Sequence, residues 1–366
     1  MNNKINLTHV IGTLKDGGAQ TQLLLLCNNI NLDIFNVTII CWDNTSSVNL
    51  KPEIAIVTVD RGNKYNLISF FFKIITATRL AKPDLLHLWL PEIITIPACV
   101  VGKIEGIPII NSLRRIPVNN FSKLWFRDRL SYFNHLVSTI TVANFKLPIA
   151  RKSLLNRILK GKYLTIFNGL DLNPSGKTSN NFKEVKNFKI CYTGRLVPQK
   201  NVELIIKAVA LLRSSGKTIS LDIYGDGYLR KDLESLTASL NIQNEVHFHG
   251  YLDDWKAKAT TADVFVFPSD REGMPNVLFE AASIGLPLIV SQIEEIKIHF
   301  TDSYDALLLK ENSIDEIVRC LNKIMLQPQL SVELRKNCLE TIKKYSVQKM
   351  VDNYEVLYLN LKSLKC

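Results

Sequence analysis

Short apolar runs alternate with longer amphipathic segments along the first half of the chain. The runs have the length and composition of buried strands, and the segments between them have the spacing of helices. The predicted strands are residues 5–11, 37–42, 54–59, 85–90, 107–111, 137–142 and 163–167, and the predicted helices are 19–31, 67–80, one after Pro91, and 122–134. Apolar strands interleaved with helices predict a parallel sheet with helices on both faces.

The second half repeats this alternation after a polar interruption. Residues 173–187 contain Pro, Gly and Ser without an apolar period, which is typical of a linker. Predicted strands lie at 188–192, 219–224, 246–249, 262–268 and 286–290, and predicted helices at 202–212, 229–240, 254–260, 277–282, 314–325, 332–344 and 347–361. We therefore predict a first domain over 1–171, a linker over 172–187, a second domain over 188–345 and a final helical segment over 346–366.

Length and composition agree with two globular domains. The chain has 366 residues, of which 46% are hydrophobic and 22% charged.

Its start lacks the features of a signal peptide, and its most apolar window, 85–101, is interrupted by Pro91, Glu92 and Pro97. Seven cysteines without a Cys-x-x-Cys pair predict buried reduced thiols rather than a disulfide framework or zinc site. We expect a cytoplasmic protein, free or peripheral on the inner face of the cytoplasmic membrane.

The stretch 269–285 carries the strongest candidate chemistry. Glu272 and Glu280 flank a tight loop between a predicted strand and a helix for which Asn276 is a suitable N-cap. The positive end of that helix would face a ligand above the loop 273–276, and the two carboxylates could accept hydrogen bonds from its hydroxyls. A ligand with both hydroxyls and phosphate is a nucleotide sugar. The alternative is a capped helix with two solvated glutamates.

A basic pair follows the strand 188–192. Arg195 stands at the end of this strand and Lys200 just before a helix that Asn201 can cap. Two cations and a helix N-terminus at the carboxyl edge of a parallel sheet can bind a diphosphate. A solvated basic pair is the alternative.

A glycine pair, Gly17 and Gly18, separates the first strand from its helix. It lets the backbone approach a ligand closely, although a tight turn explains it equally, and the spacing is not that of a dinucleotide fingerprint.

Together these motifs resemble the E-x7-E signature and its accompanying loops in retaining glycosyltransferases of family 4. That resemblance implies a GT-B fold, in which two Rossmann-like domains with parallel sheets face each other across a cleft and the final helix crosses back to the first domain. It places Glu272 beside the transferred sugar, Glu280 on the ribose hydroxyls, and Arg195 and Lys200 on the donor diphosphate. It also assigns to donor binding the backbone near His249 and a list of loop residues: Gly17, Gly18, Gly273, Met274, Pro275, Asn276 and Val277.

The resemblance further implies sugar transfer to a hydroxyl with retention of anomeric configuration. In that family the leaving phosphate helps deprotonate the acceptor, so no enzymic nucleophile is expected. No Asp-x-Asp occurs in the sequence, and we therefore expect no metal and no cofactor. The absence of a G-x-S-x-G elbow and of a P-loop disfavours a hydrolase or a kinase.

Two residues of the first half are candidates for the acceptor side. Many relatives carry a histidine after the strand 107–111, where this chain has N-S-L-R-R, so Arg114 is the candidate cleft residue. His87 is a weaker catalytic candidate, because a lone histidine in an apolar strand is more often part of the core.

Positive charge is concentrated in the first half. Residues 1–170 contain 20 Lys and Arg against 9 Asp and Glu, and the rest of the chain is balanced. Basic residues interleaved with aromatic ones at 114–133 suit an anionic membrane surface or a lipid-diphosphate acceptor. A solvated face over core aromatics is the alternative, and without a recognition motif we expect no nucleic acid partner.

The sequence therefore predicts a metal-independent hexosyltransferase. Its expected donor is a nucleotide sugar, with a lean toward a UDP-linked hexose or N-acetylhexosamine, and its expected acceptor is a lipid-linked or growing glycan in polysaccharide assembly. A GT-B sugar-nucleotide epimerase and a non-catalytic nucleotide- or glycan-binding relative stay open as alternatives.

Overall fold

The computed structural model divides the chain into two compact units. One comprises Met1–Gly169 with Val347–Cys366, and the other comprises Leu170–Ser346. The structure describes residues 4–15, 17–43, 49–62, 66–114, 126–146, 162–172 and 187–363. The predicted linker 172–187 and the basic segment 115–125 therefore lie almost entirely outside the described residues, as does 147–161.

The first unit contains a seven-stranded, all-parallel sheet with strand order β3-β2-β1-β4-β5-β6-β7. Alternate residues of its strands enter two different cores, because successive side chains of a strand point to opposite faces. Val37 and Ile39 join one core, whereas Ile40 joins the other. The strands are β1 (Ile5–Val10), β2 (Phe35–Cys41), β3 (Ala55–Thr58), β4 (Leu85–Leu88), β5 (Ile109–Leu113), β6 (Ile140–Ala143) and β7 (Tyr163–Thr165).

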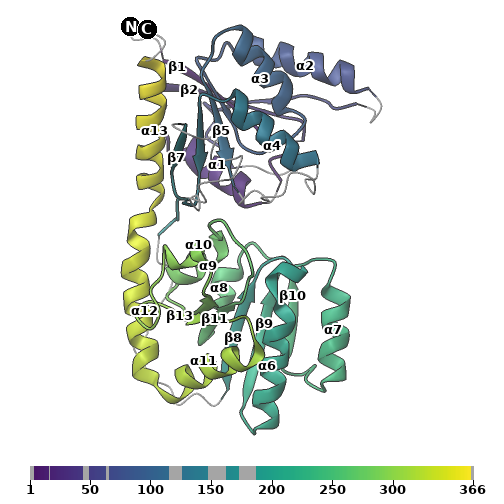
Figure 1. Ribbon diagram of the computed structural model, residues 1–366, viewed down its shortest axis with the longest axis vertical. Helices are drawn as coiled ribbons and strands as arrows, with labels where there is room; N and C mark the ends of the chain where they lie inside the picture. Colours follow the sequence, from purple (N-terminus) through teal and green to yellow (C-terminus); the bar gives the residue numbers. More distant parts are fainter. Residues whose placement is uncertain are drawn as a thin grey trace. The chain divides into compact units, whose positions relative to one another are not determined.

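Helices cover both faces of this sheet. α1 (Gly18–Asn29) and the final helix α13 (Val347–Ser363) pack against each other on one face, and α2 (Leu67–Leu80) packs against α3 (Thr95–Ile104) on the other. α4 (Phe126–Val137) packs against α3 and β5. Figure 1 shows the C-terminal helix α13 beside the sheet of the first unit, whose strands come from the N-terminal half of the chain. Met350, Tyr354 and Leu357 are buried in this core, so the end of the sequence completes the first unit.

The second unit contains a six-stranded parallel sheet with order β10-β9-β8-β11-β12-β13. Its strands are β8 (Phe188–Thr193), β9 (Ile219–Tyr224), β10 (Val246–Gly250), β11 (Val264–Phe267), β12 (Leu288–Ser291) and β13 (Leu307–Leu309). Its helices are α6 (Val202–Ser214), α7 (Arg230–Ser239), α8 (Trp255–Ala259), α9 (Asn276–Ser283), α10 (Glu294–Lys297), α11 (Ile314–Leu326) and α12 (Pro328–Ile342), with 3-10 turns η2 (Pro198–Lys200) and η3 (Lys343–Tyr345).

Most predicted elements occur within a few residues of their expected bounds, and three differ more. The expected strand at 137–142 is shortened to β6, because α4 continues through Val137 before the chain becomes extended. The strand β13 and the short helix α10 occur where no element was expected. The two parallel-sheet α/β units agree with the predicted fold class.

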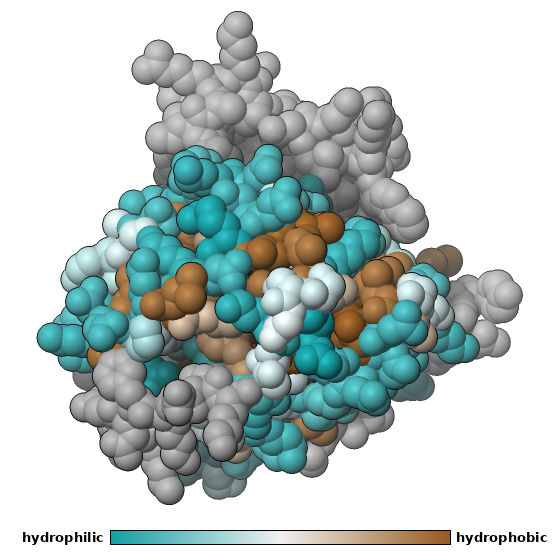
Figure 2. Space-filling model, turned by 90° about the horizontal axis from the view of Figure 1, so that it is seen from below, coloured by the Kyte–Doolittle hydropathy of each residue, from teal (hydrophilic) through white to brown (hydrophobic). Residues whose placement is uncertain are grey.

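The surface agrees with a polar exterior over apolar cores. Figure 2 shows a face on which hydrophilic residues predominate and hydrophobic ones gather in smaller patches between them. Within the described part of the chain, no helix combines the length and apolar character needed to cross a bilayer.

Candidate functional site

The strand order of the second sheet reverses between β8 and β11. From β8 the chain proceeds outward through β9 to β10, and from β11 it proceeds in the other direction through β12 to β13. Loops that leave adjacent strands at such a point diverge to opposite faces of the sheet and leave a crevice at its carboxyl edge, where α/β proteins bind ligands. Arg195 and Lys200 follow β8, and Glu272 follows β11.

Lys200 and Glu272 form an ion pair between the loops that follow β8 and β11, where the strand order places this crevice. The Lys200 ammonium donates to Glu272 Oε1, and the two side chains are only 9% and 11% exposed. Ser269 Oγ lies within hydrogen-bond distance of the same carboxylate oxygen, and the ammonium lies 4.7 Å from the centroid of the Phe267 ring. A lysine and a glutamate separated by 72 residues in sequence are thereby held together in a largely dehydrated place.

Asn201 ties the two loops to each other. It occupies the expected N-cap position of α6, but its backbone is left-handed, with φ at 51°, and its side chain makes no capping bond. Its amide instead donates to the Pro268 carbonyl at 3.0 Å and to Asp270 Oδ1 at 2.6 Å. The Asp270 backbone N–H also bonds to the Gln199 carbonyl at 3.0 Å, so the crevice walls are fixed relative to one another.

Arg195 is the exposed member of the basic pair. No carboxylate of the described residues forms an ion pair with it, and its backbone carbonyl accepts a hydrogen bond from Tyr192 Oη at 3.2 Å. Arg195, like Lys200, follows β8 at the carboxyl edge of the sheet, and no described carboxylate compensates its charge.

α9 begins one residue earlier than predicted. Pro275, not Asn276, occupies the N-cap position, and the cap makes no side-chain hydrogen bond. The Leu278 N–H bonds to the Pro275 carbonyl at 3.0 Å, so Asn276 already belongs to the first turn. The prediction of Asn276 as the cap is wrong, but the loop of Gly273, Met274 and Pro275 still leads directly into the positive end of the helix.

Glu280 lies one turn into α9 and Val277 on its first turn. Burial raises the pKa of the Glu280 carboxyl, whereas the nearby Lys256 charge and a hydrogen bond from the Trp255 side chain act in the opposite direction. A half-buried acceptor that forms no ion pair within the described part of the chain is suited to hydroxyl donors.

Gly225 brings the loop after β9 against the loop after β8. A Cβ at Gly225 would lie 2.0 Å from the Gly194 carbonyl oxygen, and its φ of 138° is one that L side chains rarely adopt. The lack of a side chain at Gly225 therefore allows these two loops to pack closely against each other. His249, at the end of β10, is exposed, stacks on Tyr224 with ring centroids 4.7 Å apart, and lies 2.6 Å from Asp222 Oδ1.

The glycine pair of the first unit begins α1, with Gly17 at its N-cap and Gly18 as its first residue. A Cβ at Gly17 would lie 2.4 Å from the Gln20 carboxamide oxygen. Further along α1, the buried Gln22 side chain accepts from the Gly169 N–H at 2.7 Å and donates to its carbonyl at 3.0 Å. α1 is thus fastened to the segment that follows β7.

His87 is fully buried in β4. Its ring nitrogens lie 2.8 Å from Tyr358 Oη and 2.8 Å from Ser112 Oγ, and both are therefore engaged. Burial, with the neighbouring His9 and Arg114, lowers the pKa of His87 well below its usual range, which keeps the ring neutral. Neither ring nitrogen is left to meet a substrate, so the geometry supports a structural role better than the predicted catalytic one.

Arg114 follows β5 at the carboxyl edge of the first sheet. Its guanidinium donates to Asn168 Oδ1 at 2.9 Å and to Tyr354 Oη at 3.0 Å, and it lies 4.4 Å from the centroid of the Trp89 ring. No carboxylate pairs with it among the described residues. Of these partners, Asn168 lies in the segment after β7, and Tyr354 belongs to α13, where nothing in the sequence indicated this contact.

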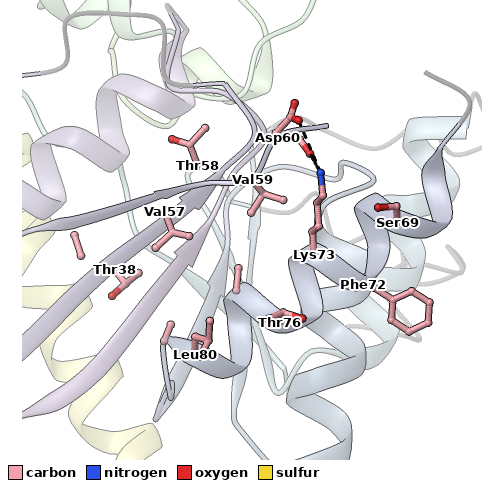
Figure 3. A pocket seen from close by; sticks show the side chains of 13 residues that line it. Thr38, Val57, Thr58, Val59, Asp60, Ser69, Phe72, Lys73, Thr76 and Leu80 are labelled. Carbon is pink, nitrogen blue, oxygen red and sulfur yellow. Dashed lines mark hydrogen bonds and ion pairs between the residues drawn. The ribbon is translucent and has the colours of Figure 1, made fainter. Parts of the chain in front are cut away.

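A hollow of about 890 Å³ lies elsewhere in the first unit, between β3 and α2. Figure 3 shows Lys73 reaching toward Asp60 at its rim, with Nζ and Oδ2 3.8 Å apart, while the Phe72 ring points away. None of its lining residues belongs to the predicted site, and the lining is mainly apolar. The described residues contain no cluster of three or more potential metal ligands.

The sequence matches a known family over much of the second unit. Residues 177–345 match the family described as Glycosyl transferases group 1. The matched segment includes Arg195, Lys200, Glu272 and Glu280, and therefore the loops that follow β8 and β11.

Characterised relatives are glycosyltransferases. The chain is 30% identical over 212 residues to the UDP-Gal:alpha-D-GlcNAc-diphosphoundecaprenol alpha-1,3-galactosyltransferase of Escherichia coli, covering 55% of this chain and 54% of that protein. It is 27% identical to a GalNAc-alpha-(1->4)-GalNAc-alpha-(1->3)-diNAcBac-PP-undecaprenol alpha-1,4-N-acetyl-D-galactosaminyltransferase of Campylobacter jejuni, covering 98% and 99%. The match to the E. coli protein thus spans about half of that relative's length, and the match to the C. jejuni protein nearly all of it.

Solved structures share the fold. Anabaena Alr3699/HepE in complex with UDP and glucose superimposes with a TM-score of 0.80 at 15% identity, covering 97% of this chain and 99% of that one. WaaG, a glycosyltransferase involved in lipopolysaccharide biosynthesis, gives 0.75 at 14% identity, with coverage of 95% and 98%. These similarities confirm the predicted GT-B fold of two parallel-sheet α/β domains.

Proposed function

We propose that this chain, whose residues 177–345 match the family of group 1 glycosyl transferases, is a retaining glycosyltransferase of family 4 that takes its sugar from a nucleotide sugar. The donor we favour is a UDP-linked hexose or N-acetylhexosamine. The acceptor we favour is a hydroxyl of a lipid-linked or growing glycan in polysaccharide or lipopolysaccharide assembly.

The observation that carries this proposal is the Lys200–Glu272 pair at the β8/β11 crevice. A diphosphate in the crevice would compete with Glu272 for the Lys200 ammonium. Lys200, together with the exposed Arg195 and the positive end of α9, can stabilise the charge that develops as the nucleoside diphosphate leaves. Stabilisation that increases along the reaction lowers its barrier.

The carboxylates have different tasks in this proposal. Glu272, held by Lys200 and Ser269, would meet the transferred sugar, and Glu280 would accept hydrogen bonds from the ribose hydroxyls. Retention requires the acceptor oxygen to attack from the face on which the leaving phosphate departs. A phosphate oxygen can then take the acceptor proton, and no protein nucleophile is needed.

Relatives support the choice of substrates. The names of the E. coli and C. jejuni proteins describe transfer to glycans on undecaprenyl diphosphate, and the E. coli name specifies UDP-Gal. We therefore propose a lipid-diphosphate acceptor, peripheral association with the inner face of the cytoplasmic membrane, and catalysis without a metal. Lys200 and Arg195 would take the place of a cation beside the diphosphate.

A transfer assay tests this function. The purified chain would be incubated with UDP-Gal, UDP-GlcNAc or UDP-GalNAc and an undecaprenyl-diphosphate-linked sugar, with and without EDTA. We expect release of UDP, an α-linked product by NMR and no loss with EDTA. A β-linked product would exclude retention, and conversion of the UDP-sugar without any acceptor would favour an epimerase.

A further inference from the structure

No carboxylate of the described residues neutralises the charge of Arg114, in the first unit. Its side chain is only partly exposed, and its hydrogen-bond acceptors are all neutral: Asn168 Oδ1 at 2.9 Å, Tyr354 Oη at 3.0 Å and Ser112 Oγ at 3.4 Å. The buried Nε has no protein partner, and no ion pair among the described residues includes this arginine. A partly dehydrated guanidinium with neutral partners keeps its full charge and favours an anion that can complete its shell.

The guanidinium is nevertheless held firmly in place by residues from distant parts of the chain. Tyr354 is fully buried and stacks on Tyr358 with centroids 5.8 Å apart. Tyr358 bonds to His87, His87 bonds to Ser112, and Ser112 lies within reach of Arg114, so the contacts close into a ring. The last helix of the chain therefore contributes two tyrosines to the placement of one arginine.

The other side of the guanidinium is fixed by Asn168. The next residue, Gly169, has both its N–H and its carbonyl bonded to Gln22 of α1. Below the guanidinium, the Trp89 ring supplies a cation–π contact at 4.4 Å, and Trp89 in turn donates to the buried His9 at 3.0 Å. Such an arrangement lowers the entropic cost of binding a ligand, because the cation is immobilised before the ligand arrives.

We infer that Arg114 is a preset phosphate-binding residue and that Tyr354 of α13 is its positioning residue. The inference rests on the proposed function, because sugar transfer between a nucleotide sugar and a lipid diphosphate supplies phosphate groups from both substrates. Arginine suits this chemistry, since it stays charged and donates in a fixed plane. Three guanidinium protons have protein partners, and a second proton on Nη1 is available for an added phosphate oxygen.

The first test does not depend on turnover. Arg114 of the full chain would be modified with phenylglyoxal and followed by mass spectrometry, alone and with inorganic pyrophosphate, UDP or farnesyl diphosphate. We expect pyrophosphate to slow the modification. Stronger protection by UDP would indicate that Arg114 binds a phosphate of the nucleotide-sugar donor, and stronger protection by farnesyl diphosphate would indicate that it binds the lipid diphosphate. Modification of Arg114 that none of the three slows would overturn the inference.

Tyr354→Phe tests the positioning role in the same experiment. It removes one hydrogen bond and keeps the ring, so Arg114 should be modified faster and protected less. Tyr345→Phe is the matched control, because Tyr345 is also a buried tyrosine whose hydroxyl forms a side-chain hydrogen bond, with His299 at 2.6 Å, but it belongs to the second unit. Equal behaviour of the two variants would assign Tyr354 to packing alone.

Kinetics provide the second arm. Relative to Tyr345→Phe, we expect Tyr354→Phe and Arg114→Lys to lower kcat/KM by roughly tenfold to a hundredfold, as expected for a lost hydrogen bond to a charged group. This decrease in kcat/KM should arise from a higher KM for the substrate whose phosphate protects Arg114 from phenylglyoxal. Normal kinetics in both variants would contradict the inference while leaving the transferase function intact. A wild-type chain without transfer activity would contradict the function, and the phenylglyoxal experiment would then decide the inference alone.

Discussion

At the scale of single residues, the central feature is a mostly buried ion pair. A buried pair adds little net stability, but removing one partner leaves an uncompensated charge. The pair is therefore better explained by the proposed diphosphate, which would compete with Glu272 for the Lys200 ammonium, than by a contribution to folding. Without a charged ligand at this site, burying the two charges would cost desolvation energy and bring no functional benefit.

Lys200→Met tests how much stability is lost when the Glu272 carboxylate has no ion-pair partner. We expect it to lower the free energy of unfolding by about 3 kcal/mol, because Glu272 loses its cation in a dehydrated place. Adding Glu272→Gln should restore most of that stability, since the amide keeps an oxygen for Ser269. Denaturant unfolding of the single and double variants measures both effects.

Sugar transfer should respond differently from stability. The double variant should remain at least a hundredfold below the wild type in kcat/KM, because both ligand-facing groups are gone. Recovery of transfer together with stability would mean that the pair only supports the fold.

Glu280 predicts a pH dependence. Its pKa is raised above the ordinary value of 4.5, so the folded state holds the proton more tightly than the unfolded state. Ionisation of this carboxyl therefore lowers the free energy of unfolding. The loss grows as the pH rises from about 4.5 through the raised pKa and stays constant above it. Glu280→Gln should match the wild type in stability near pH 4 and exceed it at pH 7, as measured by thermal unfolding across this range. A variant that is equally or less stable at pH 7 would refute the desolvation account.

At the scale of elements, the turn between η2 and α6 determines how the crevice walls meet. Asn201 combines a left-handed backbone with a side chain that bonds to the opposite loop, two properties that substitutions can separate. Asparagine adopts this backbone conformation more readily than most residues.

Asn201→Ala and Asn201→Gly should therefore differ. Alanine loses the bonds to Pro268 and Asp270 and adds backbone strain, so we expect a loss of about 2–4 kcal/mol in unfolding free energy. Glycine loses the same bonds without the strain and should cost about 1–2 kcal/mol less than alanine. Chemical denaturation of both variants checks this order, and alanine as stable as glycine would show that the conformation carries no strain.

Sequence periodicity predicted most of the elements, because strands buried on both faces and helices with one apolar face leave distinct patterns. It also placed Lys200 and Glu272 at the same sheet edge, since both follow buried strands of one parallel sheet. The cap of α9 was misassigned because Asn276 is a good capping residue by type, and the start of the helix at Pro275 depends on the loop geometry.

Contacts without a local pattern could not be predicted. Arg114 and Tyr354 are 240 residues apart, and a tyrosine in an apolar helical period looks like any other core residue. Likewise, His87 appeared as a lone histidine in a strand, and its partners Tyr358 and Ser112 come from other elements. The sequence identified the chemical groups, whereas the fold determined which of them are bonded to one another.

At the scale of the whole molecule, the two units differ in their charged features and in their similarity to known proteins. The second unit contains the family match and the crevice with its charged pair. The first unit contains the uncompensated Arg114 and the excess of positive charge, with 20 basic against 9 acidic residues in positions 1–170. A donor site in one unit and an anionic acceptor near the other would account for this division.

Donor binding should stabilise the molecule as a whole. A nucleotide sugar at about 100 times its dissociation constant adds roughly 2.7 kcal/mol to the unfolding free energy, which shifts the melting temperature by a few degrees. We expect UDP-sugars to give a larger shift than GDP- or ADP-sugars in a thermal screen. The reverse order would redirect the proposal to another base.

The most direct measurement is calorimetric titration of UDP and a UDP-sugar into the wild type, Lys200→Met and Arg114→Lys. We expect the wild type to bind both ligands with one site per chain, and Lys200→Met to bind both at least about tenfold more weakly. Arg114→Lys, in the first unit, should leave the enthalpy of UDP binding unchanged unless UDP also protects Arg114 from phenylglyoxal. Equal affinity of the wild type and Lys200→Met for UDP would contradict the placement of the nucleotide sugar at the β8/β11 crevice.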